Sequence, residues 1–128
     1  MEVQMRVAWI VDDDDEMSQA VSLMLKLLDF QCEIFRDARS TGRQMLQGRR
    51  PDVFILDINM PNVSGIDLLQ FIRTRQGFQQ VPVVMLSSET TDAQVDEAMR
   101  VGADAFVFKP VTIEELEEAL DTAFRKRS

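Results

Sequence analysis

The sequence predicts an α/β fold in which helices cover both faces of a five-stranded parallel sheet. Short apolar runs alternate strictly with longer amphipathic stretches, which requires crossover connections between successive strands. Three of the runs are almost wholly apolar, as is typical of strands buried on both sides. Polar residues follow four of the five runs, at the edge where such sheets bind their ligands.

Five apolar runs are expected to form the strands, and the second is the weakest. In chain order they are residues 7–11, 32–35, 53–56, 81–86 and 105–108. Between them, apolar residues recur at three- and four-residue spacing, as on one face of a helix. These residues are Met17, Ala20, Val21, Met24, Leu25 and Leu28; Ile66, Leu69 and Ile72; Val95, Ala98 and Met99; and Ile113, Leu116, Leu120 and Phe124. Residues 38–47 show a shorter helical pattern.

Signals for helix ends accompany this pattern. Thr112, followed three residues later by Glu115, predicts a capping box at the start of the last helix. Three glycines stand where helices are expected to end: Gly48, Gly77 and Gly102.

Composition narrows the class of protein. The 128 residues suit a single domain, and the net charge of −8 argues against binding to nucleic acid or to an anionic membrane. No apolar stretch is long enough to span a bilayer, no signal peptide is recognisable, and the lone Cys32 fits a reducing compartment. We therefore expect a cytoplasmic protein. Because the chain has no histidine, a metal site would use oxygen ligands, which favours Mg²⁺, Mn²⁺ or Ca²⁺.

Polar side chains at four strand ends form the candidate site. They are Asp12 and Asp13, Asp57, Ser87 and Ser88, and Lys109. Taken singly, each has a simpler explanation, such as a solvated loop for the acidic run or a turn before Pro61 for Asp57. Because the carboxyl ends of parallel strands share one edge, we expect these groups to converge.

Phosphoryl transfer to a carboxylate is the chemistry that suits these groups. Asp57 can act as a nucleophile and form an aspartyl phosphate. A Mg²⁺ ion shared by Asp12, Asp13 and Asp57 would neutralise part of the transition-state charge, and Lys109 and Ser87 would take the rest.

Four segments, in order and at these separations, make the chain similar to the receiver domains of two-component response regulators. They are IVDDDDE, PDVFILDINMPNVSGIDLL, VPVVMLSSE and GADAFVFKPV. The resemblance covers about residues 5–125 of a single domain spanning residues 1–128. It implies a doubly wound (βα)5 fold with the flavodoxin-like strand order 2-1-3-4-5. It also implies a signalling domain, not an enzyme, that assists only its own phosphorylation and dephosphorylation.

The resemblance assigns the metal site and the phosphoacceptor. Asp57 would accept the phosphoryl group. Asp13, Asp57 and the backbone carbonyl of Asn59 would bind Mg²⁺, with Mn²⁺ as a possible substitute. Asp12 would help to hold the metal, largely through water. Gly65 would support the turn that follows.

The resemblance also assigns residues that respond to phosphorylation. Lys109, before a frequently cis bond to Pro110, would pair with the phosphoryl group. Ser87 would bond to it, with Ser88 beside it, and Phe106 would swing inward as Ser87 moves.

Two further residues are predicted to tune the lifetime of the phosphoryl group. Asn59 and Glu89 stand two residues after Asp57 and Ser87, where they would flank the approach of an attacking water. Both can hydrogen-bond a water, and the same pair occurs in fast-cycling chemotaxis-type receivers. The simpler alternative is that both are solvated loop residues.

The expected partners follow from the same resemblance. A sensor histidine kinase or phosphotransfer protein would supply the phosphoryl group. A downstream protein or an effector domain would read the face formed by the fourth helix, fifth strand and fifth helix. Whether the domain stands alone or belongs to a longer regulator or hybrid kinase stays open.

The exposed side of the fourth and fifth helices is expected to be acidic, through Asp92, Asp96, Glu97, Glu114, Glu117, Glu118 and Asp121. Leu23 and Leu27 either form a partner surface or, as we expect, pack against the last helix.

Three other classes of protein are alternatives to a phosphorylated receiver. A phosphatase of the haloacid dehalogenase type would need an aspartate at the position of Asn59. A flavodoxin-like FMN carrier would need a Gly- and hydroxyl-rich loop after the first strand, where this chain is acidic. A receiver-like interaction module that is not regulated by phosphorylation is the remaining alternative.

Overall fold

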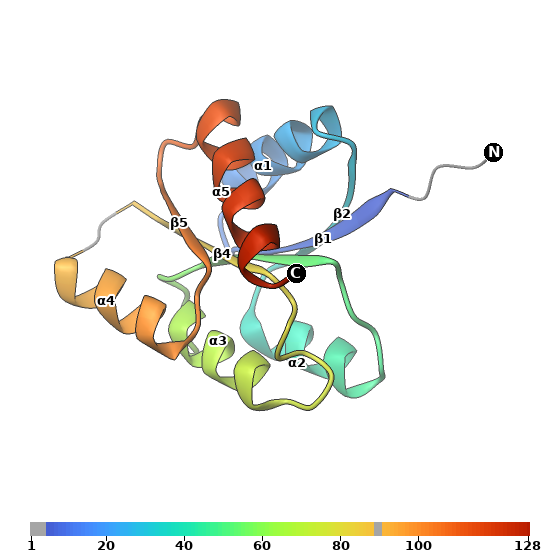
Figure 1. Ribbon diagram of the computed structural model, residues 1–128, viewed down its shortest axis with the longest axis vertical. Helices are drawn as coiled ribbons and strands as arrows, with labels where there is room; N and C mark the ends of the chain where they lie inside the picture. The colour runs from blue at the N-terminus through green and yellow to red at the C-terminus, as the bar shows by residue number, and fades with distance from the viewer. Residues whose placement is uncertain (1–4, 89–90) are drawn as a thin grey trace.

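Five parallel strands lie between two layers of helices in the computed structural model, which describes residues 5–88 and 91–128 (Figure 1). The strands are β1 (Arg6–Val11), β2 (Phe30–Phe35), β3 (Val53–Asp57), β4 (Val83–Ser87) and β5 (Ala105–Phe108). The helices are α1 (Asp15–Leu27), α2 (Ala38–Leu46), α3 (Gly65–Thr74), α4 (Asp92–Val101) and α5 (Ile113–Lys126). The strand order is β2-β1-β3-β4-β5, so the predicted fold class and topology are confirmed.

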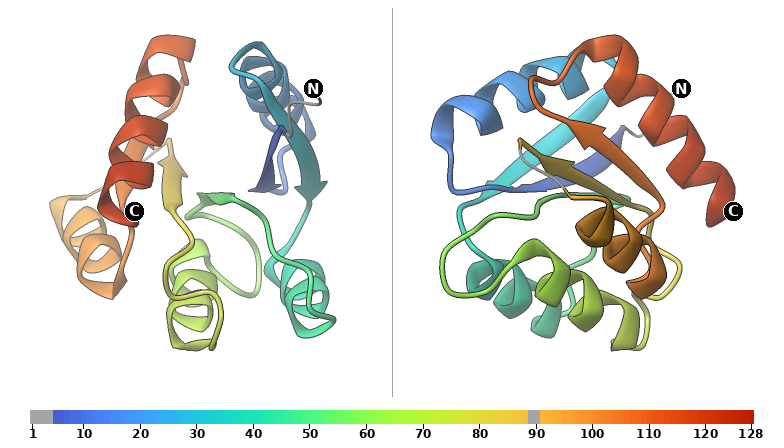
Figure 2. Two further views of the ribbon diagram at one scale, coloured as in Figure 1. Left: turned by 45° about the vertical axis from the view of Figure 1, so that its right-hand side comes forward. Right: turned by 90° about the vertical axis from the view of Figure 1, so that its left-hand side faces the viewer.

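Side chains alternate between the two faces of the sheet, and each face has its own core. Ala8 and Ile10 of β1 belong to the core beneath α1 and α5. Trp9 and Val11 belong to the core beneath α2, α3 and α4. Figures 1 and 2 show these two helical layers on opposite sides of the sheet. The double coverage explains why the central strands are almost wholly apolar.

Strand boundaries differ from the prediction at the fourth run. Val81 and Pro82 precede β4, because proline has no N–H to contribute to the ladder. The Pro82 carbonyl still accepts a hydrogen bond from the Phe54 N–H at 2.9 Å. At their other ends, β3 and β4 extend one residue further than predicted, through Asp57 and Ser87.

Helix caps follow the sequence in part. Thr112 accepts a hydrogen bond from the Glu115 N–H at 3.2 Å, but its hydroxyl donates to the Glu115 carboxylate, so only one half of the predicted box forms. A complete capping box stands instead at Thr91 and Gln94, at the start of α4. Gly77, expected to end α3, lies three residues beyond its last residue.

A buried charged cluster at the amino-terminal edge of the sheet was not predicted. Asp104 is 2% exposed and accepts hydrogen bonds from Arg73 Nη2 at 2.9 Å and Arg127 Nε at 2.7 Å. Its Oδ2 also accepts from the Val83 N–H at 2.9 Å, and both arginines donate to the Gly102 carbonyl. Burial lowers the pKa of Arg73 to about 10, so it stays charged at neutral pH. The cluster joins α3, α5 and the segments before β4 and β5.

Two surface leucines contradict the expected packing of α1. Leu23 is 62% exposed and Leu27 is 68% exposed, so neither is buried against α5. The physical reason is that α1 turns Val21 and Leu25 into the core, and at helical spacing Leu23 and Leu27 then lie on its opposite side. Across the described ranges, none of the helices is both long and apolar enough to cross a membrane.

Candidate functional site

Four strand ends bring the predicted polar residues together, because the strands are parallel and in register. Val11 pairs with Leu56, Asp57 with Leu86, and Ser87 with Phe108. Asp12 therefore lies beside Asp57 at one edge of the sheet, and Lys109 reaches the same place from the end of β5. The predicted convergence is confirmed for these residues.

Three carboxylates form the centre of the site. Asp12, Asp13 and Asp57 each offer an oxygen, and these oxygens lie within 4.8 Å of one another. Asp12 is fully buried and Asp57 is 3% exposed, while Asp13 is more open to solvent. This is the one such group of three potential metal ligands found in residues 5–88 and 91–128.

The backbone fixes Asp12 before any ligand binds. Its N–H donates to the Phe35 carbonyl at 3.0 Å, which extends the β1–β2 ladder by one residue. Its Oδ1 accepts from the Asp14 N–H at 2.9 Å, and its carbonyl accepts from the buried Ser18 hydroxyl at 3.4 Å. Asp14 in turn caps α1 by accepting from the Met17 N–H. Asp14 is thus the N-cap of α1. Ser18 was missed, because a lone serine within a helical pattern carries no signal.

Lys109 places an ammonium group between two of the carboxylates. Its Nζ lies 3.1 Å from Asp12 Oδ2 and 3.5 Å from Asp57 Oδ1. Its backbone N–H donates to the Ser87 carbonyl at 2.8 Å, and the Lys109–Pro110 bond is cis. One positive charge therefore faces a group of three carboxylates, which leaves the site negative and suited to a cation.

Burial and charge alter the acidity of both partners. Burial raises the pKa of Asp57 to about 6, the Asp12 carboxylate adds to this rise, and Lys109 opposes it. Burial acts to lower the pKa of Lys109, but the hydrogen bonds and charges of Asp12 and Asp57 outweigh it and raise the pKa overall. Lys109 is therefore charged at neutral pH, and Asp57 titrates unusually close to neutrality without a metal.

The metal-free protein is expected to gain stability as the pH falls from 7 to 5. Native Asp57 takes up its proton near pH 6, whereas an unfolded aspartate does so near 3.8, so acidification between these values favours the fold. The gain over this pH range is on the order of 1 kcal/mol. Urea denaturation in the presence of a chelator, at pH 7 and pH 5, measures it. Asp57→Asn should lack this component, and equal pH dependence in the two proteins would contradict the assignment.

Ser87 is the last residue of β4 and lies beside Asn59. The Asn59 amide donates to the Ser87 hydroxyl at 3.3 Å, and the Asn59 N–H lies 3.4 Å from Asp57 Oδ1. Ser87 is buried, whereas Ser88 is exposed. Asn59 and Ser87, each predicted for the site, thus lie beside Asp57. Of the predicted pair Asn59 and Glu89, only Asn59 is described, because Glu89 lies outside the described residues.

Phe106 lies outside the carboxylate cluster. Its ring is half-buried against the core of the α2, α3 and α4 layer and stands 5.2 Å from the ring of Phe108. Phe108 is 51% exposed and pairs with Ser87 across β4 and β5. Phe106 pairs with Met85, so it lies two residues along the β4–β5 ladder from the pair formed by Ser87 and Phe108.

Gly65 allows the turn after β3 to close on the site. Its N–H donates to the Ile58 carbonyl at 2.9 Å, and Ser64 before it caps α3. A Cβ atom added at Gly65 would lie 2.1 Å from the Asp57 carbonyl oxygen. Glycine is required here by close approach of two backbone segments, which supports the expected role.

The donor set matches a small, hard divalent cation. The side chains that converge are carboxylates, and Mg²⁺ and Mn²⁺ both prefer oxygen ligands. The burial and mutual repulsion that raise the pKa of Asp57 are relieved by a positive charge at the same place. The site is therefore compatible with Mg²⁺.

Known proteins resemble the chain over nearly its whole length. A family model described as the response regulator receiver domain matches residues 8–121. The chain is 32% identical over 117 residues to Chemotaxis protein CheY of Pseudomonas aeruginosa, covering 91% of this chain and 94% of that protein. It is 35% identical over 117 residues to Chemotaxis protein CheY-3 of Vibrio cholerae, covering 91% and 90%. The solved structure of Vibrio cholerae chemotaxis protein CheY4 matches with a TM-score of 0.84 and 30% identity, covering 94% of this chain and 99% of that one.

Proposed function

The chain belongs to the response regulator receiver domain family, and from this premise we propose that Asp57 is its phosphoacceptor. Receiver domains are signalling modules of two-component systems. The observation that carries the proposal is the Asp57 carboxylate at the end of β3, beside two further carboxylates and within 3.5 Å of the Lys109 ammonium. A sensor histidine kinase or a phosphotransfer protein is the proposed donor, in the cytoplasm.

The reaction is a displacement at phosphorus. An Asp57 carboxylate oxygen forms the new P–O bond, and the bond from phosphorus to the donor's imidazole nitrogen breaks, its electron pair going to that nitrogen. Lys109 donates to a phosphoryl oxygen, exchanging part of its contact with Asp12 and Asp57 for the product. Bound Mg²⁺ would supply charge neutralisation for the incoming anion. Its proposed ligands are Asp12, Asp13, Asp57 and the backbone carbonyl of Asn59.

The proposed switch begins at Ser87. A phosphoryl group on Asp57 attracts the Ser87 hydroxyl, which accepts from the Asn59 amide in this structure. Movement of Ser87 would shift the end of β4, to which Phe108 is paired. Phe106, two residues before Phe108 on β5, is proposed to move as a result. Ser88 is proposed to move with Ser87. The face of α4, β5 and α5 would then differ between the two states, for a downstream protein or an effector domain to read.

The test is phosphorylation by a small donor. With Mg²⁺ and acetyl phosphate, the intact mass should rise by one phosphoryl group, and a chelator should prevent the rise. Mn²⁺ should substitute for Mg²⁺. Absence of a mass increase with either metal would reject phosphoacceptor function and favour an interaction module that is not regulated by phosphorylation.

The phosphoryl group is expected to be short-lived. Asn59 lies beside Asp57 and carries an amide that can orient a water for hydrolysis, and we propose the same role for Glu89. Two of the relatives are named chemotaxis proteins, which suits a signal that must decay. Asn59→Met combined with Glu89→Leu should slow decay roughly threefold or more, which corresponds to about 0.6 kcal/mol in the barrier.

The lifetime is measured by removing the donor and following the mass of the phosphorylated protein. Gln70→Met, an exposed amide on α3, is the matched control and should decay as wild type does. Equal decay rates for the double variant and the control would show that Asn59 and Glu89 are loop residues with no influence on hydrolysis.

A further inference from the structure

A groove runs between α2 and α3, on the side of the sheet away from α1 and α5. Both views in Figure 2 show these two helices side by side. Three hollows succeed one another along it, because the first two share Ala38, Arg39 and Val63 and the last two share Phe71. The groove is independent of the carboxylate site, although the loop carrying Val63 follows β3.

The floor of the groove is apolar. The middle hollow, of about 240 Å³, is lined by Ala38, Gly42, Val63, Leu68 and Phe71 between Arg39 and Asp67. Gly42 keeps the hollow open because it has no side chain. A Cβ atom added there would have Phe71 as its nearest neighbour at 3.8 Å, an ordinary contact, so a side chain at this position has room to enter the hollow. One helical turn after Gly42, Leu46 is 58% exposed and continues the apolar surface.

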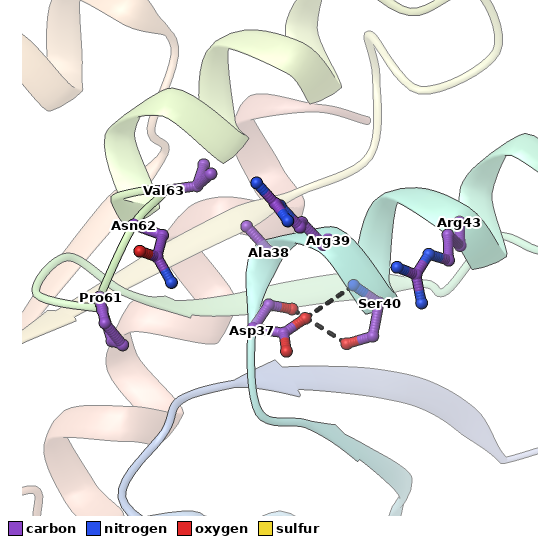
Figure 3. A pocket seen from close by; sticks show the side chains of 8 residues that line it. All are labelled: Asp37, Ala38, Arg39, Ser40, Arg43, Pro61, Asn62 and Val63. Atoms are coloured by element: carbon purple, nitrogen blue, oxygen red, sulfur yellow. Dashed lines mark hydrogen bonds between the residues drawn. The ribbon is translucent and has the colours of Figure 1, made fainter.

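Basic side chains line the rim. Residues 36–50 hold five arginines and one aspartate in a chain whose net charge is −8. Arg49 pairs with Glu33 and Arg36 with Asp15, but neither Arg39 nor Arg43 has an ion pair with any carboxylate in the described ranges. Figure 3 shows Arg39 extending towards Val63 across the first hollow, with Arg43 one turn further along α2.

The single aspartate in this stretch is engaged locally. Asp37 caps α2 by accepting from the Ser40 N–H at 2.7 Å, as the dashed line in Figure 3 marks. It therefore satisfies the helix terminus, and the two arginines on the rim remain available to an outside partner.

We propose that this groove binds an amphipathic helix of a partner protein, with its apolar face on Gly42 and Phe71 and acidic side chains against Arg39 and Arg43. An apolar floor with a charged rim is the surface that receives such helices. The groove suits roughly ten residues of helix, since α3 itself has ten residues and spans about 15 Å.

Charge and burial argue against other occupants. A second copy of this chain could offer the acidic α5, but Leu116 and Leu120, the apolar face of that helix, are buried in its own core. The net charge of −8 opposes any anionic partner, and most strongly one with an extended charged surface, such as an anionic membrane or nucleic acid. A short acidic helix would contact the groove alone, where Arg39 and Arg43 line the rim.

The test uses the unphosphorylated, full-length chain, so that its outcome does not depend on Asp57. The probe is a fluorescein-labelled 18-residue peptide with leucines at three- and four-residue spacing and glutamates on both flanks. Fluorescence anisotropy should show saturable binding that weakens with salt. Binding should weaken at least tenfold in Arg39→Glu combined with Arg43→Glu. It should weaken equally in Gly42→Leu, which fills the groove and leaves the charge unchanged.

Matched controls separate the groove from general charge effects. Lys26→Glu combined with Lys126→Glu makes the same charge change on α1 and α5 and should leave affinity within twofold of wild type. Thermal melts confirm that each variant is folded. A peptide with lysines in place of the glutamates should not bind.

Several results would overturn the proposal. These are no saturable binding, equal binding of the lysine peptide, or undiminished binding by folded Gly42→Leu. Self-association in sedimentation that is lost in the double arginine variant would assign the groove to a second copy. Retention on phosphatidylglycerol vesicles that is lost in the same variant would assign it to a membrane.

Discussion

Asp57→Asn is expected to abolish the gain of one phosphoryl group from acetyl phosphate. The substitution keeps the size of the side chain but replaces a carboxylate by an amide, which is too weak a nucleophile to attack phosphorus. Asp57 is buried at the end of β3, and the loss of its charge relieves repulsion from Asp12, so the variant should be folded. Intact mass after incubation with Mg²⁺ and acetyl phosphate measures the effect.

Two other aspartates serve as controls for this result. Asp67→Asn, in the exposed first turn of α3, should be phosphorylated as wild type is. Asp13→Asn keeps the acceptor but removes one proposed metal ligand, so it should need a higher Mg²⁺ concentration for the same extent of reaction. A full phosphoryl mass shift in Asp57→Asn would show that the acceptor is another residue.

Gly65→Ala should be the most damaging single methyl addition near the site. The new Cβ would lie 2.1 Å from the Asp57 carbonyl oxygen and 2.9 Å from Ile58 Cα, and both neighbours are backbone atoms that cannot rotate away. We expect a loss of about 3 kcal/mol in the free energy of unfolding. For a chain of this size that corresponds to a melting temperature lower by roughly 10 °C. Because the displaced carbonyl belongs to Asp57, phosphorylation should slow as well.

Gly42→Ala is the matched control, since it adds the same methyl group within a helix. Its nearest neighbour would be Phe71 at 3.8 Å, so no strain arises, and alanine favours the helix by about 0.5–1 kcal/mol. Thermal melts of the two variants should therefore move in opposite directions. A melting temperature for Gly65→Ala within a degree or two of wild type would mean that the turn can relax without cost.

Most of the fold could be predicted from the sequence because the relevant signals are local. Apolar runs and helical spacing repeat within ten to fifteen residues, and they define the layers and their alternation. The site was also predictable, because its residues stand at strand ends and a parallel sheet brings strand ends together. Asp57 and Ser87 are recognisable both by residue type, as a carboxylate and a hydroxyl, and by position, at the end of an apolar run.

Features that depend on distant residues could not be predicted. Arg73, Asp104 and Arg127 lie on different elements, and no pattern along the chain relates them. The exposure of Leu23 and Leu27 depends on which side of α1 faces the core, and Val21 and Leu25 occupy that side. The groove between α2 and α3 exists because Gly42 has no side chain to fill it. Counting apolar residues along the sequence does not reveal such a space.

The buried cluster of Arg73, Asp104 and Arg127 has a mechanical consequence. It clamps α3, α5 and the starts of β4 and β5 at one edge of the sheet, while Ser87 and Lys109 lie at the opposite edge. We therefore expect the edge of the sheet that holds this cluster to stay fixed when the carboxylate site changes. Displacements at the carboxylates should be largest near the free ends of β4 and β5 and should fade towards the clamp.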